Sequence, residues 1–243
     1  MNDRSALLRP TDEDARRLAR TLLRGARHVA LAVLDPLTGG PFVSRVLLGT
    51  QPDGSLSILA SRLSTHTKAL LADPRLSILA GEPGKGDPLA HPRLTVQGLA
   101  EPVERDSAIH EAMRTRFLAR HPKSKLYIDF PDFLFFRIIP EAASLNGGFG
   151  KAFLLEGEDF RISQNLRLPE GMSEAEAIQD LGYRGGTLPP HLHIFGGNRQ
   201  RREMRIFALD AAGIDLFWGN SALRWEFSAP ATTLEEVQQR LSI

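Results

Sequence analysis

The 243-residue sequence predicts an α+β fold, an antiparallel β-barrel followed by a smaller α+β domain. Two observations predict this fold. Five or six strand-like segments lie before residue 156 with few helical segments between them, which favours a barrel over a doubly wound sheet. After Phe160 the pattern changes to a helix, three short strands and a last helix. We therefore expect residues 156–166 to link a domain of residues 1–155 to one of residues 167–243.

The first domain is expected to begin with an amphipathic helix. Thr11 precedes the acids Asp12–Asp14, and apolar residues then recur at helical spacing as far as Gly25, which predicts an N-capped helix. Ile109, Met113 and Phe117 define one face of a later helix. Alternation and turn residues predict strands at 28–34, 41–48, 54–60, 76–80, 94–103, 133–139 and within 143–155, with helices at 64–72 and 106–120.

The second domain combines helices with short strands. Its predicted elements are a helix at 173–181, strands at 204–209, 214–218 and 223–227, and a last helix through Leu241. Thr232 or Thr233 with Glu235 or Glu236 forms the capping box of that helix. Trp218 and Trp225 flank a turn, and we expect them to fill the core of this domain.

Composition excludes several classes of protein. A formal net charge of +1, from 30 basic and 29 acidic residues, argues against a nucleic-acid partner. The absence of cysteine excludes disulfides, thiolate metal sites and thiol catalysis. No apolar run reaches the length of a membrane span, and Met1–Pro10 lacks the apolar stretch of a signal peptide, so a cytoplasmic location is expected.

A polar cluster follows the second and third predicted strands, which we expect a tight turn at Pro52–Gly54 to join. Hydroxyls of Ser64, Thr65 and Thr67 open a helix there, beside three cations, Arg45, Arg62 and Lys68. Helix-terminal N–H groups and fixed cations both favour a phosphate monoester, and FMN is the ligand we predict. The competing interpretation is that the hydroxyls only cap the helix and that Arg45 is a solvated edge cation.

Several motifs resemble the FMN-binding split barrels. These are the run Ser61–Pro74, the strand with Gln97–Gly98, and Leu145–Ala152. His121–Pro122, Tyr127 and Phe130–Phe133 are similar to the pyridoxamine-phosphate-oxidase-like proteins of the haem-utilisation group, over roughly residues 10–155.

More weakly, Ile206–Leu216, Arg224, Phe227 and Glu235–Leu241 resemble the companion domain that often follows this barrel. That domain usually opens with a helix containing two histidines. The corresponding segment here, Gly171–Ala177, contains neither.

The resemblance implies an antiparallel split β-barrel that binds FMN at the interface of a homodimer and acts on a small-molecule substrate. It places the phosphate at Ser64–Lys68, and Gln97 at the edge of the flavin ring. His66 stands where many split barrels have a lysine. The residues expected to hold the cofactor are Ser44, Arg45, Val46, Ser61, Arg62, Ser64, Thr65, His66, Thr67, Lys68 and Gln97.

Three alternatives stay open. The protein is a haem-binding or haem-degrading member of the same branch, with His66, His121, His191 or His193 as ligands. It is a non-catalytic flavin-binding module, or it is a barrel that has lost its flavin. No catalytic residue is predicted, because the sequence contains no nucleophile elbow, paired carboxylates or Walker loop.

Four further features have competing interpretations. His191 and His193 share one face of a predicted strand, but two imidazoles make an incomplete metal site, so no metal is predicted. His121 is expected to end a helix, where a protonated ring is favourable. Gln97 is either a core amide or a ring contact. Gly147, Gly148 and Gly150 form either a plain turn or a loop that passes close to a flat ligand.

Overall fold

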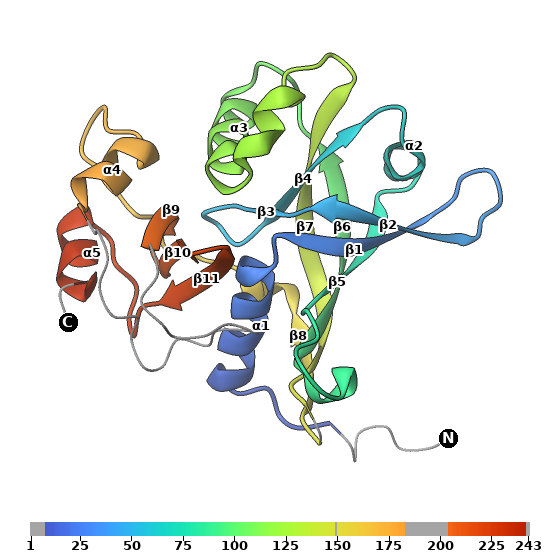
Figure 1. Cartoon of the computed structure of the whole chain (residues 1–243), viewed down its shortest axis with the longest axis horizontal. Helices are drawn as coiled ribbons and strands as arrows, with labels where there is room; N and C mark the ends of the chain where they lie inside the picture. Colours follow the sequence, from blue (N-terminus) through green and yellow to red (C-terminus); the bar gives the residue numbers. More distant parts are fainter. Residues whose placement is uncertain (1–7, 149, 183–203, 242–243) are drawn as a thin grey trace.

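The computed structural model describes residues 8–148, 150–182 and 204–241, which form a large and a small sheet (Figure 1). The large sheet has eight strands, and every pairing in it is antiparallel. It curls into a half-barrel with the strand order β2-β1-β5-β6-β7-β4-β3, and β8 is added on β7. Its strands are β1 (His28–Leu34), β2 (Pro41–Leu47), β3 (Gly49–Thr50), β4 (Leu56–Ser61), β5 (Arg75–Ala80), β6 (Arg93–Pro102), β7 (Phe133–Asn146) and β8 (Ala152–Glu156). The predicted α+β class and antiparallel barrel are confirmed.

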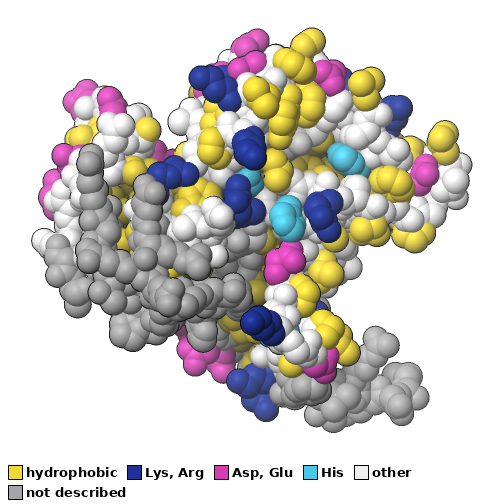
Figure 2. Space-filling view, in the orientation of Figure 1, with side chains coloured by type: hydrophobic (Ala, Val, Ile, Leu, Met, Phe, Trp, Pro, Cys, Tyr) yellow, Lys and Arg dark blue, Asp and Glu magenta, His cyan; other side chains and the backbone are white. Residues whose placement is uncertain are grey.

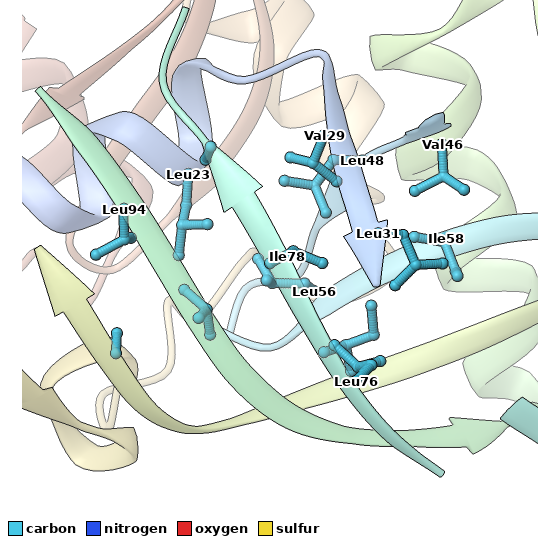
Figure 3. Packing of buried hydrophobic residues seen from close by; sticks show 14 of the residues in the cluster. Leu23, Val29, Leu31, Val46, Leu48, Leu56, Ile58, Leu76, Ile78 and Leu94 are labelled. Carbon is cyan, nitrogen blue, oxygen red and sulfur yellow. The ribbon is translucent and has the colours of Figure 1, made fainter. Parts of the chain in front are cut away.

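Alternation along the strands builds the barrel core. In β1 every second residue is buried, and Leu31 on β1 packs with residues such as Ile58 on β4 and Ile78 on β5 (Figure 3). The helices α1 (Glu13–Gly25), α2 (Thr65–Ala72) and α3 (Ala108–Arg120) contribute further buried side chains. One face of the curled sheet is thereby covered.

Three details of the barrel differ from the sequence prediction. Asp12, not Thr11, caps α1, because its carboxylate accepts from Ala15 N at 2.8 Å while the Thr11 hydroxyl donates to Leu154 O. Strand β7 runs unbroken for 14 residues instead of ending at Ile139. The buried face of α3 excludes Ile109, which is 56% exposed.

Strands β2 and β4 do not form the expected hairpin. Strand β2 pairs with β1, whereas β4 pairs with β3 and β7. The turn at Pro52–Gly54 therefore joins the two-residue β3 to β4. Gly54 has a φ of 92°, and a Cβ atom there would lie 2.0 Å from the Phe160 carbonyl, so only glycine fits.

The small sheet, with order β11-β10-β9, forms a second hydrophobic core in a C-terminal region that we call the companion domain. It contains β9 (Met204–Asp210), β10 (Gly213–Trp218) and β11 (Ser221–Glu226), with α4 (Glu174–Asp180) and α5 (Leu234–Leu241). Trp218 and Trp225 are buried in this core, as predicted. The chain crosses from one core to the other between Phe160, which packs in the barrel, and Leu166, which packs in the small domain.

The two domains meet at a buried ionic network, which we call the seam. Arg24 Nη1 of α1 lies 2.9 Å from Asp215 Oδ2 and 3.0 Å from Asp210 Oδ2. Arg224 on β11 contacts the same two carboxylates at 3.1 and 2.7 Å. Burial alone would raise the pKa of Asp215, but Arg24 and Arg224 outweigh it and lower the pKa to about 2.

No helix in the described ranges is long and apolar enough to cross a membrane.

Candidate functional site

The corner where β4 passes into α2 contains most of the residues singled out from the sequence. Ser64 is the N-cap residue of α2, yet its hydroxyl does not cap the helix. The Ser64 hydroxyl instead donates to Ser61 O at 2.7 Å. The N-terminal turn of α2 thus has no capping side chain from Ser64, and its positive dipole end faces this corner.

His66 joins two hydroxyls from different elements. Its Nδ1 lies 3.1 Å from Ser44 Oγ on β2, and its Nε2 lies 3.0 Å from Ser64 Oγ. The only hydroxyl proton of Ser64 goes to Ser61 O, so Nε2 must carry the ring proton and Nδ1 must accept from Ser44. Thr67 then donates to Ser64, 2.8 Å away. Burial lowers the pKa of His66, which favours this neutral ring at physiological pH.

Ser61 fixes the loop before α2. Its hydroxyl donates to Asp132 Oδ2 at 2.6 Å, and Arg62 N donates to Asp132 O at 2.7 Å. Asp132 was not singled out from the sequence, although it lies within the aromatic Phe130–Phe133 motif. A carboxylate between one proline and one phenylalanine, Pro131 and Phe133, was the available signal.

Three exposed cations surround the corner. Arg45, Arg62 and Lys68 are exposed, and the ion pairs of the described residues give none of them a carboxylate partner. Arg45 follows Ser44 on β2, so its side chain lies on the opposite face of the strand. The cations therefore flank the hydroxyl cluster rather than all pointing into it.

The remaining predicted residues are more scattered. Val46 is buried in the barrel core and Thr67 is buried on the inner side of α2, whereas Thr65 is exposed. Gln97 is exposed on β6, beside a bulge at Gln97/Gly98, and does not contact the hydroxyl cluster. Its exposure excludes the core-amide interpretation.

The uncovered side of the barrel sheet, which we call the outer face, extends over six strands from β2 to β8. Two rows of paired residues cross it, and most of their side chains are small or apolar. One row contains Val43, Ala32, Ser77, Gln97, Ala142 and Glu156, and the other contains Arg45, Ala30, Leu79, Thr95, Ser144 and Leu154. Val43, Leu79 and Leu154 are 62%, 45% and 56% exposed, so this face is an apolar surface that the described residues leave open.

A cavity of about 450 Å³ lies on the outer face. Gln97 and Ser77 line it together with Ala32, Leu34 and Ala142, and Arg75 lies on its wall. Small side chains leave a flat floor on a sheet, so a planar ring can lie against it.

The glycine cluster is a turn in the described part of the chain. Gly148 has a φ of 106° and its N–H donates to Asn146 Oδ1 at 3.1 Å, while Gly147 N donates to Lys151 O. Positive φ thus explains Gly148 and Gly150 without a ligand.

His121 is the C-cap residue of α3, as expected, but its ring is not in the protonated form that is favourable at a helix end. His121 follows α3, but its ring is buried, packs on Phe117, and lies with Nε2 2.8 Å from Leu48 O. Burial lowers the pKa of His121 to about 4, so the ring is neutral. His191 and His193 lie outside the described residues, within which no cluster of potential metal ligands occurs.

Comparison with known proteins identifies the barrel. Residues 10–161 match the family model described as CREG, beta-barrel. The chloroplastic heme oxygenase HOZ of Arabidopsis thaliana is 38% identical over 159 residues, and heme oxygenase HutZ of Vibrio cholerae is 29% identical over 151 residues. The matches cover 64% and 60% of this chain, and 46% and 82% of those proteins.

Two solved structures match almost the whole chain. A protein of unknown function from Agrobacterium tumefaciens is 30% identical, with a TM-score of 0.76 and 97% of both chains covered. A heme binding protein from Mycobacterium smegmatis is 25% identical, with a TM-score of 0.57, covering 97% of this chain and 96% of that one. By the match over residues 10–161, this chain belongs to the CREG β-barrel family, in a group whose relatives include haem-utilisation proteins.

Proposed function

We propose that this protein binds haem as a homodimer, on the outer face of the barrel. The observation that carries the proposal is the similarity of nearly the whole chain, companion domain included, to a heme binding protein. The names of the two relatives, both heme oxygenases, support the same ligand.

The outer face fits such a ligand. The cavity of about 450 Å³ has a floor of small side chains, suited to a planar macrocycle. The exposed Val43, Leu79 and Leu154 beside it are suited to a second copy of this chain, which would enclose the ring from the other side.

Cations on this face and at the α2 corner suit the propionate groups of haem. Arg45 lies in the same row as Leu79, and Arg62 and Lys68 lie at the corner by α2. Because none of these cations is paired within the described residues, a propionate would gain a charge-assisted hydrogen bond without breaking an ion pair.

A histidine ligand to iron must be neutral, and the described histidines differ in access. His121 already bonds the Leu48 carbonyl inside the core. His66 is neutral and half-buried, with Nδ1 as its accepting nitrogen, so ligation through Nδ1 would replace the contact to Ser44. Because Ser44 and Arg45 lie on opposite faces of β2, His66 lies on the other side of the sheet from the outer face of its own chain. We therefore propose His66 of the second copy as the ligand, with His191 and His193 as the competitors that substitution tests.

Titration with hemin tests the proposal. We expect a saturable Soret band shifted from that of free hemin, with one hemin per chain. His66→Ala should change the position of this band. A change seen only in His191→Ala or His193→Ala would instead identify that histidine as the ligand to iron. A spectrum identical to that of free hemin at all protein concentrations would reject haem binding.

Addition of a reductant under air separates a binding protein from an enzyme. If the chain shares the activity for which its relatives are named, we expect the Soret band to decay in air and to stay unchanged under nitrogen. A stable band in air would restrict the function to binding.

The second candidate ligand is FMN, the cofactor of an oxidoreductase. It is favoured by the α2 corner, where an N-terminal turn without a Ser64 cap lies near unpaired cations. Purified protein with flavin absorbance bands, or saturable quenching of added FMN, would support this candidate. A colourless protein that leaves FMN fluorescence unchanged would exclude it.

The two ligands compete for the same cations. Replacing both Arg45 and Lys68 by Ala should lower the affinity for the ligand by roughly 10- to 1000-fold, since each substitution removes a charge-assisted contact. Lys151→Ala, which removes an exposed cation from the β7–β8 turn, is the matched control and should leave affinity unchanged.

A further inference from the structure

A small cavity opens where the barrel and the companion domain meet. It encloses about 210 Å³ and is lined by Arg27 and Pro122 from the barrel and by Arg205, Phe217, Gly219 and Asn220 from the companion domain. Figure 2 shows Lys and Arg side chains gathered on this part of the surface. The cavity is distinct from the α2 corner and from the outer face, with which it shares no lining residue.

Two guanidinium groups share one aromatic ring in this cavity. The Cζ atoms of Arg27 and Arg205 lie 5.4 and 4.9 Å from the centroid of the Phe217 ring. Arg205 also reaches the Ala119 carbonyl, but only at 3.5 Å. Among the ion pairs of the described ranges, neither arginine has a carboxylate partner. The ring attracts both cations without neutralising either, so their mutual repulsion is uncompensated.

A third arginine adds positive charge behind the ring. Arg120 is 1% exposed, and its Cζ lies 5.2 Å from the centroid of Phe207, whose ring packs on Phe217 at 4.6 Å. Its Nη2 donates to the carbonyls of Arg24 and Ala26, while Nε and Nη1 have no hydrogen-bond partner among the described residues. Burial lowers the pKa of Arg120 to about 10, which still leaves it charged at neutral pH.

Most carboxylates near the cavity are paired with other groups, and Glu82, which lines a neighbouring pocket with Arg27, is exposed and lies 3.5 Å from His28 Nδ1. Asp210 and Asp215 are paired with Arg24 and Arg224 in the seam, and Glu174 is paired with Arg116. Arg27, Arg120 and Arg205 therefore give this side of the seam an excess of positive charge within the described residues. An anion entering the cavity would remove that repulsion.

We propose that this cavity binds an oxyanion, a phosphate or carboxylate group of a small metabolite, clamped between Arg27 and Arg205. Guanidinium groups present paired N–H donors that match the oxygens of both groups. The Asn220 side chain supplies a further amide donor at the cavity wall. Phe217 forms an apolar wall, which weakens competition from water.

The position of the two arginines gives binding a structural consequence. Arg27 precedes β1 of the barrel and Arg205 lies on β9 of the companion domain, so a bound anion bridges the domains. A ligand that binds only the docked arrangement stabilises it by mass action. Oxyanion binding should therefore raise the thermal stability of the whole chain.

Isothermal titration of the full chain with inorganic phosphate, and separately with succinate, tests the proposal. Sodium chloride at matched ionic strength is the reference. We expect saturable binding of one anion per chain and a rise in Tm beyond that in chloride. The phosphate and succinate arms show which group the site prefers.

Arg27→Gln and Arg205→Gln should each weaken binding by about tenfold or more, because each removes a charge-assisted contact. Arg205→Lys retains the charge and should bind with intermediate affinity. Lys151→Gln, distant in sequence and exposed on the β7–β8 turn, should bind like the unaltered chain. Far-UV circular dichroism verifies that each variant is folded.

Two results would overturn the proposal. One is heat and Tm changes in phosphate and succinate that equal those in chloride. The other is saturable binding that both glutamine variants retain at full affinity, which would place the anion elsewhere. Neither result depends on haem, so the proposal stands or falls separately from the proposed function.

Discussion

The outer face of the barrel and the seam face of the companion sheet are both sides of an antiparallel sheet, and they differ in what covers them. Phe207, Phe217 and Ala222 of the small sheet pack against Ala119 of α3, beside the ionic network of Arg24 and its partners. On the outer face, by contrast, the apolar side chains of Leu79, Val43 and Leu154 are exposed. Contacts within the chain therefore complete the seam, whereas the described residues leave open the outer face, on which we propose that haem and a second copy bind.

The largest effect is expected from breaking the seam. Asp215 is fully buried between Arg24 and Arg224 and also accepts from Thr50 Oγ1 at 3.2 Å. Asp215→Ala leaves two buried guanidinium groups without this carboxylate, so we expect a loss of about 3–5 kcal/mol in the free energy of unfolding. Denaturation in urea measures it.

Asp73→Ala is the matched control, because it removes a half-buried carboxylate whose partner, Arg75, is exposed. It should leave stability nearly unchanged. Equal effects of the two substitutions would contradict the distinction between the seam and the rest of the surface.

The second largest effect is expected from acid, which protonates the carboxylates of the seam. Because the pKa of Asp215 is lowered from 3.8 to about 2, its contribution is complete above the unfolded pKa and is lost as pH falls from about 4 towards 2. The pKa of Asp210 is lowered as well, so its contribution is also lost as pH falls. We expect the free energy of unfolding, measured by urea denaturation at each pH, to fall more steeply across this window than in Asp215→Asn. Parallel curves for the two proteins would refute this assignment.

A substitution that places a charge on the outer face tests whether this face is the proposed dimer interface. Leu79→Asp should raise the dissociation constant of the proposed homodimer by about 30-fold or more, because a buried carboxylate would replace a central apolar contact. Light scattering after size-exclusion chromatography measures the mass.

Leu126→Asp serves as the control, since Leu126 is 77% exposed but lies after α3, outside the sheet. A Leu79→Asp protein that still has the mass of a dimer would place the interface elsewhere.

The smallest effect concerns α1, which contacts both domains. Asp12→Ala removes the acceptor for Ala15 N, so stability should fall by about 1 kcal/mol. Thr11→Val, which loses only a hydroxyl bonded to Leu154 O, should cost less. The reverse order in thermal denaturation would restore Thr11 as the cap.

Local patterns predicted the elements of the fold better than their pairing. The alternation of β1 and the turn before β4 are visible in a few neighbouring residues. Whether β2 pairs with β4 is decided by β1 and β7, which compete for the same strand edges. Long-range pairing has no local signature, so the hairpin was predicted between β2 and β4, whereas the turn joins β4 to the two-residue β3.

The burial of charged side chains was the other feature that the sequence did not predict. Arg116 and Arg120 on α3 look like a solvated helix face, and they are buried because Glu174, Asp210 and backbone carbonyls of α1 reach them from distant parts of the chain. The same dependence on tertiary contacts made His121 neutral rather than protonated.

The candidate site was predictable in part. Ser64, His66 and Thr67 share one helical turn, so their proximity follows from spacing, and Ser44 joins them from β2. Gln97 lies on the outer face, away from this cluster. Whether one ligand contacts both regions depends on a second copy of the chain, which a single sequence does not encode locally.

Strand β7 has a consequence for how the protein is synthesised. It pairs with β4, β6 and β8, and its first half is the partner of β4, whose residues precede it by more than 70 positions (Figure 1). During translation, β4 leaves the ribosome with one long edge unpaired until Phe133–Ile138 has been made. Nascent chains should therefore depend on chaperone protection over that interval, and the barrel should close late.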